Sequence, residues 1–208
     1  MIPKVPDSFE DKWLIQLTNL IGSSSQPLFV DNKKESFSLR NECLPNVDEK
    51  IRKDGGTRIL GWQVWQTEYL IEAEFHAIWM SPEGQLLDIT PHPFPLSKVL
   101  FIPDQSITYD GSQIDNIRLN TSGNSVVDDL IKVCEAKFAI SNKGNRAKEY
   151  NLKLTGDEAI FWELLQQMQV GLPIMLSKGA TRHQTCFCGK DKYKKCHGKY
   201  LSHVLGRL

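Results

Sequence analysis

Three of the five cysteines of this chain lie within eleven positions near its C-terminal end, together with a histidine. The group consists of Cys186, Cys188, Cys196 and His197. Thiolate sulfur and imidazole nitrogen are the ligands that Zn²⁺ takes in tetrahedral structural sites, and three cysteines with one histidine form a common set. So short a segment cannot fold by apolar burial alone, and bound metal would supply its folding energy. We predict a Zn²⁺ site here; the alternatives are incidental free thiols, or His183 or His203 in place of His197.

A second set of reactive side chains is spread along the sequence: Cys43, His76 and Asp88. A thiol attacks a carbonyl as the thiolate, which a helix N-terminus and a nearby imidazole stabilise, while a carboxylate orients that imidazole. Pro45 fits the first turn of a helix, so Cys43 is expected at the start of that helix. The three residues therefore predict a thiol active site. The alternatives are a small buried cysteine, a core histidine and an aspartate that only caps a hairpin.

The turn between the strands of His76 and Asp88 tests whether these two side chains can meet. Residues 81–85 read Ser-Pro-Glu-Gly-Gln, which fits a three-residue hairpin loop with Gly84 in the left-handed conformation. Pairing Ser81 with Gln85 sets His76 opposite Thr90 and makes His76 and Asp88 diagonal neighbours on one face. A two-residue loop would place them on opposite faces. The turn residues favour the register that catalysis needs.

The C-terminal segment resembles the SEC-C motif, a small zinc-binding module attached to many bacterial proteins. The matching residues are Cys186, Cys188 and Gly189 at its start, Lys192, Tyr193 and Lys194 in its middle, and Cys196, His197 and Gly198 at its end. The spacer between the second and third cysteines is one residue shorter than in the motif. The resemblance implies zinc and an interaction role, and it covers about the last twenty-five residues.

Residues 40–95 are similar to the transglutaminase-like branch of the papain-type cysteine hydrolases. The matching residues are Cys43, Gly55, Gly56, Gly61, Trp62, His76, Ala77, Ile78, Trp79, Gly84, Asp88, Ile89 and Thr90. The resemblance implies that Cys43, His76 and Asp88 hydrolyse, transfer or deamidate amide bonds, an activity that some members have lost. The residues flanking Cys43 depart from the family pattern. Gln26 and Asn41 are candidate oxyanion donors by residue type only.

Other candidate residues have simpler expected roles. Cys134 lies in an amphipathic segment and is expected in the core. His92, between two prolines, is expected to be structural, with a role as the base as the alternative. The tryptophans at positions 62, 65 and 79 have strand spacing and are expected in the core rather than in an acyl-binding groove.

The pattern of apolar residues predicts an α+β fold, with helices packed on an antiparallel sheet. Helices are expected at residues 8–22, from Pro45 to Gly55, around residues 126–140, and from Thr155, as the start of a capping box, to Gly171. Strands are expected at residues 58–66, 69–80, 85–90 and 98–104. We expect two units: an α+β body at residues 1–177 and a zinc-binding tail at residues 178–208.

Charge is distributed unevenly between these two units. The chain has 25 Lys/Arg and 25 Asp/Glu, and from Lys178 onward there are eight basic residues and one acidic residue, Asp191. The body is therefore acidic and the tail basic. This difference suggests that the tail binds an anionic partner; the alternative is that the small zinc-binding tail simply covers its surface with lysines. No apolar window is long enough for a membrane span, and the first residues do not resemble an export signal, so a reducing, cytoplasmic location is expected.

Two functions remain open from the sequence. The first is a cysteine-dependent amide hydrolase or acyltransferase whose zinc-binding tail docks it to a protein partner. The second is a zinc-binding adaptor without activity that contacts a protein or a nucleic acid. Sequence-specific nucleic-acid binding has weaker support, which rests on three aromatic residues in the basic tail: Phe187, Tyr193 and Tyr200.

Overall fold

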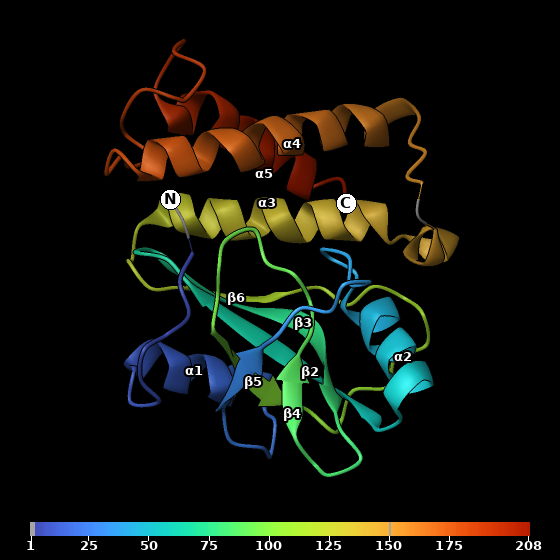
Figure 1. The fold of residues 1–208 in the computed structure, drawn as a ribbon. Coiled ribbons are helices and arrows are strands. Elements are labelled where there is room, and N and C mark those ends of the chain that lie inside the picture. Colours follow the sequence, from blue (N-terminus) through green and yellow to red (C-terminus); the bar gives the residue numbers. More distant parts are fainter. Residues whose placement is uncertain (1–2, 150) are drawn as a thin grey trace.

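The computed structural model describes residues 3–149 and 151–208 and combines a small barrel with surrounding helices (Figure 1). The helices are α1 (Lys12–Ile21), α2 (Cys43–Asp54), α3 (Ser125–Ser141), α4 (Gly156–Leu176) and α5 (His197–Leu205), with short 3₁₀ turns η1 (Gly144–Lys148) and η2 (Tyr193–Lys195). The strands are β1 (Leu28–Asn32), β2 (Thr57–Gln66), β3 (Leu70–Met80), β4 (Leu86–Asp88), β5 (Lys98–Pro103) and β6 (Ile117–Asn120). The mixture agrees with the predicted α+β class.

Five strands form the barrel in the order β2, β5, β1, β4, β3, and β3 closes it by pairing with β2. β6 extends the sheet beyond β3. β1 and β4 run parallel, with Asp31 opposite Leu87, while the other neighbours are antiparallel. The plain antiparallel sheet expected from the sequence is therefore wrong. A parallel pair needs a long crossover, and here α2, β2 and β3 intervene between the two parallel strands.

Alternating side chains of the strands fill the barrel and hold two helices against its outside. The interior cluster comprises Val30, Ile78, Val99 and Phe101. α1 packs Leu14 and Leu17 on the outer face of β2 and β3, and α2 packs Val47 on a separate outer cluster with Ala77 and Ile89. Trp62 and Trp79 are buried in these outer clusters, as expected, whereas Trp65 is only half-buried. α2 is thus fixed against the strand that carries His76.

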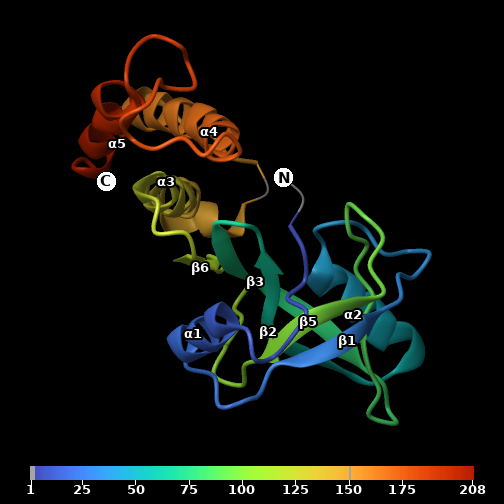
Figure 2. The same cartoon turned by 90° about the vertical axis from the view of Figure 1, so that its left-hand side faces the viewer.

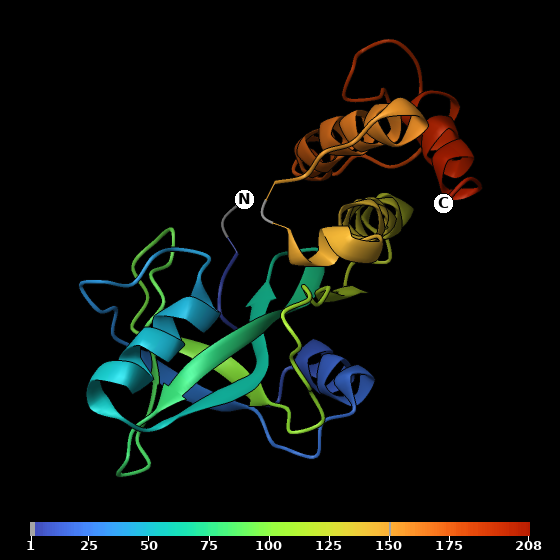
Figure 3. The same ribbon diagram turned by 90° about the vertical axis from the view of Figure 1, so that its right-hand side faces the viewer.

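A separate helical layer covers the end of the sheet where β6 lies. α3 lies between the barrel and the pair α4 and α5 (Figures 1, 2 and 3). One hydrophobic cluster joins α3, α4 and the C-terminal segment, with Cys186, Tyr193, Leu201 and Val204 buried in it. The boundary expected between residues 177 and 178 remains a prediction, but the packing joins the tail to α3 and α4. In the part of the chain described, no helix has the length and apolar character that a membrane crossing requires.

Two helix ends differ from those expected. α1 begins after Asp11 rather than near Ser8, because the Asp11 carboxylate accepts hydrogen bonds from the backbone N–H groups of residues 13 and 14. α4 continues past Gly171 to Leu176. Gly171 is required there by a close contact with Phe187, not by a helix stop. The capping box at Thr155 does not form: the Thr155 side chain makes no capping bond, and Glu158 pairs with Arg146 instead.

Candidate functional site

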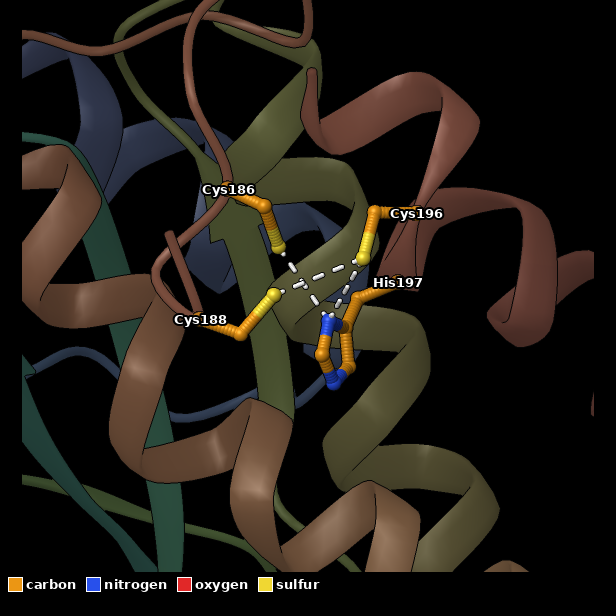
Figure 4. Close-up of side chains that lie close together, drawn as sticks. All are labelled: Cys186, Cys188, Cys196 and His197. Carbon is orange, nitrogen blue, oxygen red and sulfur yellow. Dashed lines mark hydrogen bonds between the residues drawn. The ribbon is translucent and has the colours of Figure 1, made fainter. Parts of the chain in front are cut away.

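The four predicted metal ligands come together at the C-terminal end of the chain (Figure 4). Sγ of Cys186 lies 3.2 Å from Nδ1 of His197, which lies 3.4 Å from Sγ of Cys196. Sγ of Cys188 lies 3.4 Å from Sγ of Cys196, and all four ligand atoms are within 4.8 Å of one another. A zinc tetrahedron with ordinary bond lengths separates its ligand atoms by about 3.5–3.8 Å. The cluster can therefore hold a metal ion, and His197 is its histidine.

Short-range backbone bonds place these ligands. The Gly189 N–H donates to the Cys186 carbonyl (2.8 Å), and Gly189 has a φ of 78°, which suits a residue without a side chain. The Cys186 N–H donates to the Asp191 carbonyl across the loop (2.8 Å). His197 is the first residue of α5, directly after Cys196. A tight turn and a helix start thus present the two halves of the cluster to each other.

The residue between the first two cysteines anchors the cluster to α4. A Cβ atom added to Gly171 would lie 2.4 Å from the ring of Phe187, so the ring packs directly on the backbone of α4. The centroids of the Phe187 and His197 rings are 4.3 Å apart. Phe187 therefore packs between α4 and the ring of His197, so α4 supports one of the candidate metal ligands.

A buried polar group fixes the tail to α3 as well. Asp129 of α3 is buried and forms an ion pair with Arg182 at 3.2 Å. Burial raises the pKa of Asp129, and the Arg182 guanidinium opposes this shift. Tyr193 is fully buried, and its pKa is raised by burial and by the charge of Asp129. These contacts hold the loop before the cluster in one position.

The thiol site is built around the hairpin of β3 and β4, in the register that the turn predicts. The Ser81 N–H donates to the Gln85 carbonyl (2.8 Å), and Gly84 has a φ of 87°. Trp79 pairs with Leu87, which places His76 and Asp88 on one face. Nε2 of His76 lies 3.1 Å from Oδ1 of Asp88. The predicted contact between His76 and Asp88 is confirmed.

The Asp88 carboxylate is fully buried and accepts hydrogen bonds from four donors. The four are the ring of His76 (3.1 Å), the Thr90 N–H (3.0 Å), the ring of His92 (2.7 Å) and the side-chain amide of Asn32 (2.8 Å). Burial would raise the pKa of Asp88, but the charge of His76 and these bonds hold it well below its ordinary value. An ionised carboxylate in this position fixes the His76 ring and its tautomer.

His76 meets Asp88 and Cys43 at once. Burial would lower the pKa of His76, but the Asp88 carboxylate and the Cys43 thiol together raise it well above the ordinary histidine value. Since Nε2 faces Asp88, the remaining ring nitrogen, Nδ1, is the atom available to the thiol. The structure therefore brings together all three residues that the sequence singled out, and their catalytic role remains a prediction.

Cys43 is the first residue of α2, as Pro45 predicts, and among the described residues no side chain caps that helix end. The preceding loop is clamped by Asn46, whose side chain accepts from the Leu39 N–H and donates to the Leu39 carbonyl, both at 2.8 Å. Asn41 in this loop has a φ of 64°, which is uncommon for a residue with a side chain. The clamp fixes the approach of the chain to Cys43.

Cys43 lies between two cavities that share it as a wall. The first, of about 340 Å³, is also lined by His76, His92 and Gln63, and the second, of about 580 Å³, extends along the start of α2. Asn41 borders both cavities, whereas Gln26 is exposed and lines neither. Cys43 is therefore bordered by open space on two sides.

His92 binds the carboxylate that contacts His76, in agreement with its expected structural role. The structure also adds residues to this site that the sequence does not single out. Asn32 and Asn46 hold the aspartate and the cysteine loop, and Gln63 lines the cavity. The partners of Asn32 and Asn46 lie at least seven positions away along the chain, and no local sequence pattern reveals these contacts. Cys134 is half-buried in α3, apart from the site, in agreement with its expected core role.

Comparison of the chain with models of protein families, with curated proteins and with solved structures gave no match. Any function proposed for this chain therefore rests on the positions of its side chains.

Proposed function

We propose that this protein is a cysteine-dependent amide hydrolase or acyltransferase, with Cys43 as nucleophile, His76 as general base and acid, and Asp88 as the residue that orients His76. One observation carries the proposal: the His76 ring is bound to a buried carboxylate on one side and meets the thiol of Cys43 on the other. The cysteine also begins a helix and borders open cavities. This arrangement agrees with the resemblance to transglutaminase-like enzymes.

The chemistry follows from these positions. The Cys43 thiol gives its proton to Nδ1 of His76, and the helix N-terminus and the imidazolium stabilise the thiolate. The sulfur attacks a substrate carbonyl carbon and forms a C–S bond; the C–N bond then breaks, and the amine leaves with the proton from His76. Water or a second amine attacks the resulting thioester, transfers a proton to His76 and releases the Cys43 sulfur.

The metal cluster has a different proposed role. Three cysteines and one histidine are the set that suits zinc, and because they would fill a tetrahedral shell, the ion has no open position for a substrate. We assign it a structural role in which it fixes the start of α5 against the loop of residues 181–192. The segment would then act, like the SEC-C motif that it resembles, as a docking tail for a protein partner with an acidic surface.

The thiol proposal is tested by the rate at which iodoacetamide alkylates Cys43 at about pH 6.5, followed residue by residue by mass spectrometry. An unassisted thiol is roughly 1% thiolate at this pH. We expect Cys43 to react at least about tenfold faster in the wild type than in a His76→Ala variant, because the imidazole stabilises the thiolate. Cys134 should react slowly in both, because burial raises its pKa.

The matched control is His183→Ala, which removes an exposed histidine in the tail and should leave the rate unchanged. Equal alkylation rates in the wild type and in His76→Ala would refute the thiol site. The zinc-binding adaptor would then be the better description of the protein.

A further inference from the structure

A buried side-chain amide on β2 has a donor without a partner. Gln63 is 1% exposed, and its Nε2 makes no hydrogen bond to any residue that the structure describes. A buried amide donor left without an acceptor is unfavourable, because it has lost its hydrogen bonds to water and gained none in the protein. The sequence could have placed an apolar residue here, as it does at the neighbouring positions, Trp62 and Val64. The donor is therefore expected to have a use in a bound state.

The strand register places this amide beside the catalytic imidazole. Gly61 lies directly opposite His76, and Gln63 lies opposite Glu74, so Gln63 and His76 are diagonal neighbours on one face of the β2–β3 pair. Residues in this diagonal relation are separated by about 7 Å, a distance that long side chains can span. Trp62 and Val64 point to the opposite face, against α1. Gln63 lines the same cavity as Cys43 and His76.

We propose that Nε2 of Gln63 binds the carbonyl oxygen of an amide substrate and holds the oxyanion that forms when Cys43 attacks, with the backbone N–H of Cys43 as second donor. This inference rests on the proposed function. In the step, the sulfur forms a bond to the carbonyl carbon and the carbonyl π electrons move to oxygen. The negative oxygen accepts the two hydrogen bonds until the C–N bond breaks and the carbonyl re-forms.

The chemistry of the side chain fits this role. A glutamine amide donates at every working pH and carries no charge, so it does not disturb the thiolate beside it. Because the group is buried and held in place, its hydrogen bond to an oxyanion is stronger than in water. The two oxyanion donors suggested by residue type in the sequence fit less well: Gln26 is outside the cavity, and Asn41 is exposed at its edge.

The test compares two reactions of the same thiol in the full-length protein. Acylation of Cys43 by p-nitrophenyl acetate passes through an oxyanion, whereas alkylation by iodoacetamide does not. We expect Gln63→Ala and Gln63→Met to slow acylation by roughly 10²-fold, the loss typical of one oxyanion donor, while alkylation stays within about twofold of the wild type. Gln63→Met keeps the size of the side chain without a donor or a charge, and it covers the case in which Gln63→Ala does not fold.

Gln66→Ala on the same strand is the matched control, because Gln66 is half-buried and does not line the cavity. Gln66→Ala should acylate like the wild type. Asn41→Gly removes the competing donor and suits the positive φ of this position, and it should lose much less acylation than either Gln63 variant. Undiminished acylation in both Gln63 variants, an equal loss in both reactions, or a comparable loss in Asn41→Gly would overturn the assignment of Gln63. The proposed function fails separately, if alkylation of Cys43 does not depend on His76.

Discussion

Replacement of Asp88 by asparagine tests whether the buried carboxylate organises the thiol site. Oδ1 accepts from the His76 ring and the Thr90 N–H, and Oδ2 accepts from the His92 ring and the Asn32 amide. Asparagine keeps the shape but offers one oxygen, and its NH₂ group would face two other donors. At about 1.5–3 kcal/mol for each lost bond to a charged acceptor, Asp88→Asn should lower the free energy of unfolding by about 3–6 kcal/mol.

Urea unfolding at pH 7, followed by tryptophan fluorescence, measures this change, because three tryptophans lie in β2 and β3. Such a loss is a large part of the roughly 5–15 kcal/mol by which a domain is stable. The control is Asp31→Asn on the adjacent strand: the Asp31 side chain is 46% exposed and pairs with Lys98 only at 3.9 Å, so the change should cost at most about 1 kcal/mol. A cost below about 1 kcal/mol for Asp88→Asn would refute the reasoning.

The same variant has an expected pH dependence. Folding lowers the pKa of Asp88, so its stabilising contribution is complete above the unfolded aspartate pKa of about 3.9. The contribution is lost as the pH falls from there toward the folded pKa. The difference in unfolding free energy between the wild type and Asp88→Asn should therefore shrink below about pH 4. A difference that stays constant down to acid pH would show that Asp88 is not held ionised.

Two further predictions concern the tail. Chelation of metal, or Cys188→Ser, should increase amide hydrogen exchange in α5 and in the C-terminal half of α4 but not in the barrel. The reason is that the tail and α4 share one hydrophobic cluster. Unchanged exchange in α4 would contradict this coupling. Gly171→Ala places a methyl group 2.4 Å from the Phe187 ring, so it should lower the free energy of unfolding by about 1–3 kcal/mol and weaken metal retention. Gly206→Ala is the control: its methyl group would lie 3.5 Å from the nearest atom, the Ser202 carbonyl oxygen, and it should have neither effect.

Features encoded within a few neighbouring residues could be predicted from the sequence. The metal ligands are adjacent or two positions apart in two short segments, and Gly189 permits the turn between them. The hairpin at Ser81 sets the register of β3 and β4 through its own turn chemistry, and with it the contact between His76 and Asp88. Turn type and strand alternation act over a few residues, so they can be read without the fold.

Features that depend on distant segments were decided by the tertiary structure. The meeting of Cys43 with His76 requires α2 to pack on β3, and the parallel pairing of β1 with β4 requires the barrel to close. Gln63 looks in the sequence like any polar residue of an alternating strand. Its burial, its unpaired donor and its place in the cavity follow from register and packing across three strands. Local preferences select the elements, but which side chains share a cavity is set by the packing of segments far apart along the chain.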